Sequence, residues 1–340
     1  MTEAHPADEL FASILETLPA GYRRRLSQRL LRNAVDMVLQ QPEMLDLKIA
    51  TGALGELGDA FSMFSTSKGV PKVTIFGSAR VADDDPLYEA TRIVAQHLAN
   101  AGWMIVTGAG PGIMQAGMEG AGREQSIGVS VRLPFEQGAN PVIAGDSKYV
   151  SMKYFFTRKL MLVKESKGFI CLPGGFGTLD ETFELLTLTQ TGKGAPSPIV
   201  LLDTPGDPYW ETVHEFIMEQ LVARGLVSPD DTSLYLITED CERAVDEIVG
   251  FYRNYDSMRY VGDTLVLRLK VAPTEAQLSH LNEQFGDLCG SGSIHVANPF
   301  EPEIADHDSL ELQRIAIPAA RHHYGELRRL IDQCNAFVAD

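Results

Sequence analysis

The sequence has few cysteines, little positive charge and no long hydrophobic run. Its four cysteines, scattered from Cys171 to Cys334, form no CxxC motif and no Cys/His pairing at metal-ligand spacing, so we expect buried reduced thiols and no metal site. The chain has 46 acidic and 29 basic residues, and the resulting net charge of −17 disfavours nucleic acid and membranes as partners. No apolar run is long enough to span a bilayer and the amino terminus lacks a signal-peptide pattern, so a soluble cytoplasmic protein is expected.

The glycine-rich turns also lack the commonest nucleotide-binding signatures. The stretch GAGPGI at 108–113 does not fit GxGxxG, and no acidic residue follows where it could bind the ribose diol of a dinucleotide. None of the turns carries the GK[ST] sequence that holds a triphosphate and its magnesium ion. No lysine lies in a recognisable setting for a Schiff base with pyridoxal phosphate, and we predict no cofactor.

What the sequence does have is an alternation of short β-branched runs and helical lengths over residues 71–256. This alternation predicts an α/β fold with a doubly wound, parallel, Rossmann-like sheet. Apolar residues at helical intervals predict a helical amino-terminal segment at 1–70. Residues 257–340 fit the order strand, helix, strand, strand, helix, which predicts a small α+β accessory unit with a capping Thr274 and one wet sheet face. We therefore expect three domains.

Three glycine-rich turns follow predicted strands, at 76–80 (FGSAR), 107–121 (TGAGPGIMQAGMEGA) and 173–181 (PGGFGTLDE). All three should lie at the carboxyl ends of strands, where helix N-termini offer unpaired N–H groups to an anion. This arrangement predicts a phosphate site, although a tight turn that packs a helix against a strand would also use one or two of the glycines. The phosphate- and nucleotide-binding candidates are Ser78, Gly108, Gly110, Gly112, Met152, Lys159, Gly174, Gly175, Gly177, Thr178 and Asp180.

The third turn carries the most specific pattern. Its glycine amides should face the anion while Thr178 caps the following helix. Asp180 and Glu181 should then fall in the first helical turn, where carboxylates also stabilise the helix dipole without any chemistry. A helix within SMKYFFTRKLMLVKES precedes this turn and carries Arg158, whose planar fork suits a phosphate or carboxylate, and Lys159, a more ordinary surface residue.

The motif PGGFGTLDE resembles the PGGxGTxxE signature of the LOG family, and FTRKLML resembles the RK-containing helix of that family. The segments GAGPGIM and VRLPFEQGANP are similar too, so the likeness covers about residues 70–254. The resemblance implies hydrolysis of the N-glycosidic bond of a nucleoside 5′-monophosphate, such as AMP or a cytokinin nucleotide, to free base and ribose 5-phosphate. It also implies a homodimer or higher homo-oligomer with the active site near the subunit interface. Ala109 and Gln115 differ from the glycine and carboxylate of many relatives, which leaves base recognition open.

The catalytic pair of the LOG family is the arginine and the final glutamate of these motifs, which match Arg158 and Glu181 here. A carboxylate suits both tasks of the reaction, which are to bind the ribose hydroxyls and to deprotonate the attacking water. Arg158 would hold charge near the scissile bond or the phosphate, with Asp180 in a supporting role. The alternative function is a non-catalytic nucleotide- or cofactor-binding carrier or sensor, and a scaffolding role for the two terminal segments is a third possibility.

Overall fold

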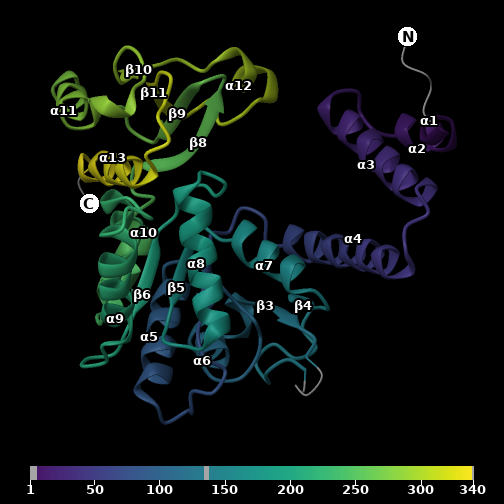
Figure 1. The fold of residues 1–340 in the computed structure, drawn as a ribbon, viewed down its shortest axis with the longest axis horizontal. Coiled ribbons are helices and arrows are strands. Elements are labelled where there is room, and N and C mark those ends of the chain that lie inside the picture. Colours follow the sequence, from purple (N-terminus) through teal and green to yellow (C-terminus); the bar gives the residue numbers. More distant parts are fainter. Residues whose placement is uncertain (1–5, 134–137, 339–340) are drawn as a thin grey trace. The chain divides into compact units, whose positions relative to one another are not determined.

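The structure is a computed structural model that describes residues 6–133 and 138–338 (Figure 1). By its internal contacts the chain divides into two compact units, Met1–Asp59 and Ala60–Asp340. The division into three domains expected from the sequence stays a prediction.

The first unit is helical, as the apolar spacing predicted. Its helices are α1 (Pro6–Leu10), α2 (Ala12–Glu16), α3 (Tyr22–Leu39) and the first part of α4 (Met44–Ser65). Asp8 of α1 accepts hydrogen bonds from Arg32 Nε and Gln28 Nε2 of α3, each at 2.8 Å. A helix as short as α1 is not stable alone, so these side-chain bonds stabilise it by holding it against α3.

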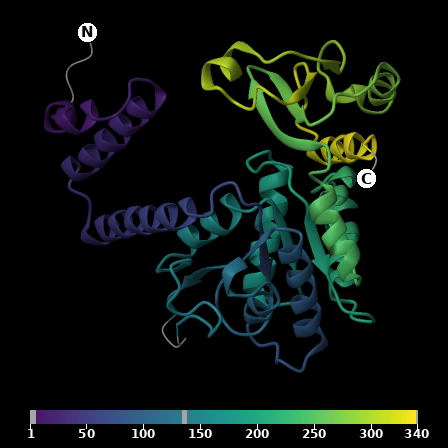
Figure 2. The same ribbon diagram turned by 180° about the vertical axis from the view of Figure 1, so that it is seen from behind.

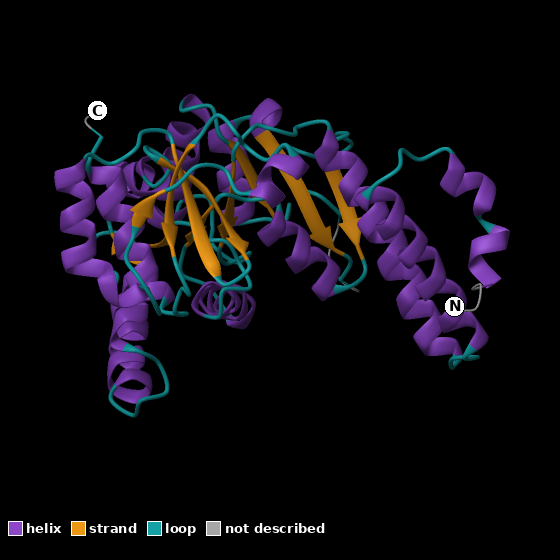
Figure 3. Ribbon diagram, turned by 90° about the horizontal axis from the view of Figure 1, so that it is seen from above, coloured by secondary structure: helices purple, strands orange, loops and turns teal. Residues whose placement is uncertain are grey.

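The second unit contains a seven-stranded parallel sheet in the order β4-β3-β2-β1-β5-β6-β7. Figure 3 shows these strands with helices on either side. The predicted doubly wound α/β fold is therefore confirmed. The strands are β1 (Lys72–Phe76), β2 (Met104–Thr107), β3 (Ser126–Val131), β4 (Tyr149–Met152), β5 (Gly168–Cys171), β6 (Ile199–Leu202) and β7 (Leu236–Thr238).

Helices cover both faces of this sheet (Figures 1 and 2). On one face, Val73 and Ile75 of β1 join an apolar core with residues of α5, α6 and α10. On the other face, the hydroxyl of Thr74 donates to Leu162 O of α7 at 2.9 Å, since neighbouring residues of a strand point to opposite sides. The helices are α5 (Pro86–Asn100), α6 (Ile113–Ala121), α7 (Phe155–Lys164), α8 (Phe176–Gln190), α9 (Tyr209–Phe216) and α10 (Cys241–Gly250).

One strand of the sheet differs from the sequence prediction. The sequence predicted a helix within SMKYFFTRKLMLVKES, but the first two residues of this segment, Ser151 and Met152, end the edge strand β4, and the helix α7 begins at Phe155. The strand is four residues long and only Met152 in it is buried, so it lacks the continuous apolar pattern of the central strands. Pairing with β3 in the register Gly128↔Tyr149 to Val131↔Met152 holds it in the sheet.

The carboxyl-terminal part forms an antiparallel sheet in the order β10-β11-β9-β8. It contains one strand more than expected, β8 (Tyr255–Val261), which pairs with β9 (Thr264–Leu269). Thr274 caps α11 (Glu275–Phe285) in a capping box with Gln277, as predicted. The other elements are β10 (His295–Val296), α12 (Glu301–Asp306), β11 (Gln313–Ile317) and α13 (Tyr324–Ala336).

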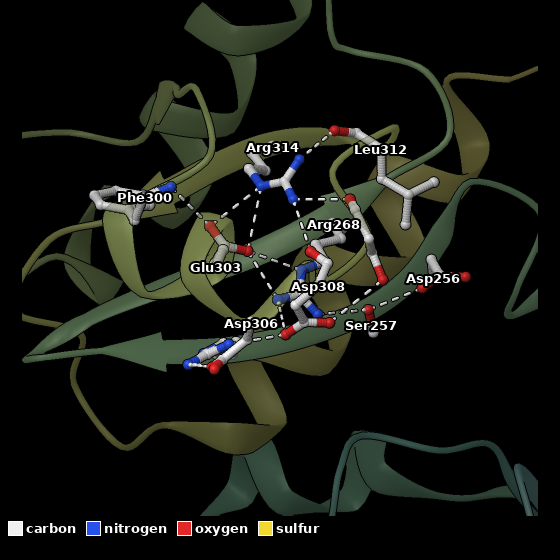
Figure 4. Close-up of polar contacts among 11 residues, drawn as sticks. Asp256, Ser257, Arg268, Phe300, Glu303, Asp306, Asp308, Leu312 and Arg314 are labelled. Atoms are coloured by element: carbon white, nitrogen blue, oxygen red, sulfur yellow. Dashed lines mark hydrogen bonds and ion pairs between the residues drawn. The ribbon is translucent and has the colours of Figure 1, made fainter. Parts of the chain in front are cut away.

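The polar face of this second sheet is buried, and the expectation of a wet face was wrong. Arg268 of β9 and Arg314 of β11 face α12, whose Glu303 is fully buried (Figure 4). Glu303 Oε1 accepts from Arg268 Nη2 at 2.8 Å, and its Oε2 accepts from Arg314 Nε at 3.2 Å. Asp308 accepts a further bond from Arg268 at 2.6 Å. These acids compensate the arginine charges, so α12 can cover the face.

All four cysteines are free, and three of them are buried, which agrees with the prediction of reduced thiols. Within residues 6–133 and 138–338 there is no helix with the length and apolar character that crossing a bilayer requires.

Candidate functional site

The strand order reverses between β1 and β5, and ligands of open parallel sheets bind at such a switch point. The turns after these two strands touch there. Ser78 N donates to Pro173 O at 3.4 Å, and a side chain at Gly174 would lie 3.1 Å from Ser78 N. The topology therefore brings the first and third glycine-rich turns to the same place.

The third turn leads directly into α8, and Thr178 does not cap this helix. Helix α8 begins at Phe176 with Gly175 as the N-cap residue, because the glycine turn itself leads into the helix. Thr178 is instead a buried residue whose hydroxyl lies where a Gly174 side chain would sit, 2.2 Å from that Cβ position. The first helical bond joins Leu179 N to Gly175 O, so the N–H groups before Leu179 precede the helical ladder.

The outer glycines of this turn face open space. A Cβ atom at Gly175 or Gly177 would meet no atom within 4 Å among the described residues, whereas one at Gly174 would collide with Thr178. Packing thus requires glycine only at Gly174. The two open positions leave the backbone accessible to a ligand at the positive end of α8.

The second turn, between β2 and α6, is shaped by close approaches. Gly112 has φ +63° and passes so near Ser78 O that a Cβ there would lie 2.5 Å away. A side chain at Gly108 would lie 2.4 Å from Arg158 Nη2, and one at Gly110 would lie 2.7 Å from Met114 Cε. Gly108 is therefore the residue that makes room for the guanidinium of Arg158.

Arg158 and Glu181 form an ion pair, with 3.1 Å between Nη1 and Oε1. Each side chain is 11% exposed, and Arg158 Nε donates to Val129 O at 3.1 Å, which fixes the plane of the guanidinium. The Nη2 group of Arg158 makes no hydrogen bond with the part of the chain described, so it remains available to a ligand. The two sequence candidates, 23 positions apart, thus meet at the carboxyl edge of the sheet.

The environment of Glu181 changes its acidity. Burial raises the pKa of the Glu181 carboxyl to about 7, and the negative charges of Asp180 and Glu184 act in the same direction. The positive charges of Arg158 and Lys159 oppose this rise. A carboxyl group with this pKa exchanges a proton near neutral pH, which suits a general base or acid.

Lys159 and Asp180 lie beside this pair and bind each other, with 2.6 Å between Nζ and Oδ2. Lys159 also pairs with Glu184 at 2.8 Å. The expectation that Asp180 and Glu181 fall in the first turn of α8 was wrong. The helix starts at Phe176, earlier than expected, and no acidic residue falls in its first turn. Stabilisation of the helix dipole therefore does not explain Glu181.

Two further candidates have structural contacts of their own. Ser78 Oγ accepts a bond from Arg80 N at 3.1 Å, which is a local turn contact. The Met152 side chain is fully buried at the end of β4, so only its backbone could face a ligand. Neither contact joins Ser78 or Met152 to the pair of Arg158 and Glu181.

Sequence reasoning missed three residues that hold the turns in place. Asn140 donates through Nδ2 to Gly110 O at 3.0 Å, and Tyr209 donates through its hydroxyl to Gly174 O at 2.7 Å. Asp203, at the end of β6, accepts from Trp210 N at 3.0 Å and so fixes the start of α9, which carries Tyr209. Burial raises the pKa of Asp203 to about 6. The position of Asp203 directly after a strand was the one signal in the sequence that could have pointed to it.

The chain is similar in sequence to one protein-family model and to several curated proteins. Residues 112–248 match the family model described as "Possible lysine decarboxylase". A probable cytokinin riboside 5′-monophosphate phosphoribohydrolase of Oryza sativa subsp. japonica is 31% identical over 99 residues, which cover 29% of this chain and 45% of that relative. The resemblance to the LOG family is confirmed. A second LOG relative, from Arabidopsis thaliana, is 33% identical over 118 residues, or 35% of this chain and 55% of that protein.

The chain spans about half the length of the LOG relatives it matches. Among solved structures, it is similar to the molybdenum cofactor binding protein of Rippkaea orientalis, at 17% identity and a TM-score of 0.38. The likeness covers 53% of this chain and 95% of that protein. At this TM-score the likeness says nothing about ligand or activity.

Proposed function

We propose that the protein hydrolyses the N-glycosidic bond of nucleoside 5′-monophosphates such as AMP or cytokinin nucleotides, releasing the base and ribose 5-phosphate. The observation that carries this proposal is the ion pair of Arg158 and Glu181 beside the open amides of the glycine turn. The names of the LOG relatives support the same reaction class, since they are cytokinin riboside 5′-monophosphate phosphoribohydrolases.

Each group of the site would have its own role in this reaction. The phosphate would bind the amides at the start of α8, where the helix dipole favours an anion. Glu181 would accept a proton from the attacking water as the bond between C1′ and the base nitrogen breaks, and the bonding electron pair leaves with the base. Arg158 Nη2, which has room beside Gly108, would donate to the nucleotide and hold its charge in place.

We also propose a homo-oligomer built through α7. Three large apolar side chains of this helix are about half exposed: Phe155 at 54%, Phe156 at 55% and Leu160 at 48%. They line a pocket of about 720 Å³ between α7 and α8, together with Lys159 and Asp180. A second copy packed on this face would bury the apolar side chains beside the site.

The test is to incubate the purified protein with AMP and with cytokinin monophosphates and to separate the products by chromatography. Free base and ribose 5-phosphate are expected from the unaltered protein, and Glu181→Gln should lose at least about 100-fold in rate because it lacks a proton acceptor. Glu184→Gln, which removes a more exposed carboxylate of the same helix, is the matched control and should retain activity.

Saturable binding of intact nucleotides without products would reject hydrolysis and favour the carrier or sensor function. Equal rates for Glu181→Gln and the unaltered protein would reject the assigned base.

A further inference from the structure

A second pocket, with a volume of about 740 Å³, lies at the opposite edge of the parallel sheet. Lys72 begins β1, Lys167 directly precedes β5, and Trp103 precedes β2, so the pocket lies at the amino ends of these strands. Arg158 and Glu181 lie at the carboxyl ends. Nothing in the proposed reaction uses the amino edge.

The charge of this pocket is opposite to that of the protein. Five of the ten lysines in the chain line it, namely Lys68, Lys72, Lys164, Lys167 and Lys270. Two carboxylates, Glu165 and Asp256, also line it. In a chain with a net charge of −17, half of the lysines therefore converge on one pocket and outnumber its acids.

The contacts within the pocket leave much of this positive charge unneutralised. Lys164 pairs with Glu165. Lys72 Nζ donates to Ser67 O and Val70 O, and Lys270 Nζ donates to Tyr252 O, but carbonyl oxygens carry no net charge. Lys167 Nζ lies 5.1 Å from the centroid of the Tyr252 ring.

Two lysines of the pocket, Lys68 and Lys72, would gain from a bound anion. The exposed Lys68 ammonium makes no hydrogen bond or ion pair within residues 6–133 and 138–338. Burial lowers the pKa of Lys72; the negative charge of Glu165 opposes this, and the positive charge of Lys164 adds to it. An anion in the pocket would relieve both effects, because it would pair with Lys68 and favour the charged form of Lys72.

We propose that this lysine pocket binds a small anion that carries two or more phosphate groups. A single phosphate would engage one or two ammonium groups, whereas a linear polyphosphate can contact lysines on several elements at once. The volume accommodates either an inorganic polyphosphate or a nucleoside polyphosphate, and these two sources share the chemistry that the lysines recognise. The proposal does not depend on the reaction at the other edge.

The test is isothermal titration calorimetry of the full chain with inorganic tripolyphosphate, with ATP and with orthophosphate. We expect one tripolyphosphate site per chain, at least about tenfold tighter than orthophosphate, with an affinity that falls as salt rises. Stronger binding of ATP than of tripolyphosphate would identify a nucleoside polyphosphate as the source, and weaker binding would identify the inorganic chain.

Charge-reversal variants test whether tripolyphosphate binds in the lysine pocket. Lys68→Glu and Lys167→Glu should each weaken tripolyphosphate binding at least about tenfold, because each replaces a favourable charged contact with repulsion. Both side chains are exposed, so thermal unfolding should stay unchanged and exclude misfolding. Lys193→Glu makes the same charge change at an exposed lysine outside the pocket and should leave the affinity intact. Equal losses in all three variants, or equal affinity for tripolyphosphate and orthophosphate, would overturn the proposal.

Discussion

Replacing Glu181 with glutamine should make the protein more stable and less active at the same time. Burial raises the pKa of the Glu181 carboxyl from 4.5 to about 7, so the folded state holds this proton more tightly than the unfolded chain does. The resulting stability is fully present below pH 4.5 and is lost as the pH rises through about 7. Each tenfold difference in proton affinity is worth about 1.4 kcal/mol, so ionised Glu181 costs the fold up to about 3 kcal/mol at pH 8.

Glutamine cannot ionise, and it therefore avoids this cost. Urea unfolding, followed by the fluorescence of Trp103 and Trp210, should show Glu181→Gln up to about 3 kcal/mol more stable than the unaltered protein at pH 8. The difference should shrink towards zero at pH 4.5. Glu184→Gln, on the same helix, should change stability by less than about 1 kcal/mol at either pH. A difference for Glu181→Gln that is equal at both pH values, or a loss of stability at pH 8, would refute burial as the cause of the raised pKa.

Two other substitutions test the site and the second sheet. Gly108→Ala should lower kcat/KM at least about tenfold, because the new methyl group would lie 2.4 Å from Arg158 Nη2 and displace the guanidinium from its place in the site. Gly58→Ala is the control, since its methyl group would meet no atom of the described residues within 4 Å. Glu303→Ala should lower the free energy of unfolding by about 3–5 kcal/mol, because Arg268 and Arg314 lose a buried partner. Glu301→Ala, exposed on the same helix, should cost less than about 0.5 kcal/mol in the same urea titration. Unchanged activity in the first variant, or equal losses in the last two, would contradict these assignments.

The local sequence pattern was sufficient to predict most strands of the parallel sheet, but it did not predict the edge strand β4. The central strands are buried along their whole length, since both faces of the sheet are covered, and runs such as MIVT in β2 and IVLL in β6 are visible in the sequence. The strand that ends at Met152 has half-buried residues and is held by pairing with β3, a contact that no local pattern encodes. The start of α8 was misplaced for a related reason, because Gly175 caps it without a side chain that could mark the position.

The sequence by itself determined the alternation of strands and helices, the three glycine-rich turns and the residue types at Arg158 and Glu181. Only the tertiary structure decided that these two side chains meet, that Gly108 makes room for one of them, and that burial moves the pKa of the other to about 7. It also decided that Arg268 and Arg314 lie under α12 and that five lysines share one pocket. The physical reason is common to all of these features: local patterns follow from neighbouring residues, whereas burial, charge pairing and acidity depend on segments that are far apart in the chain.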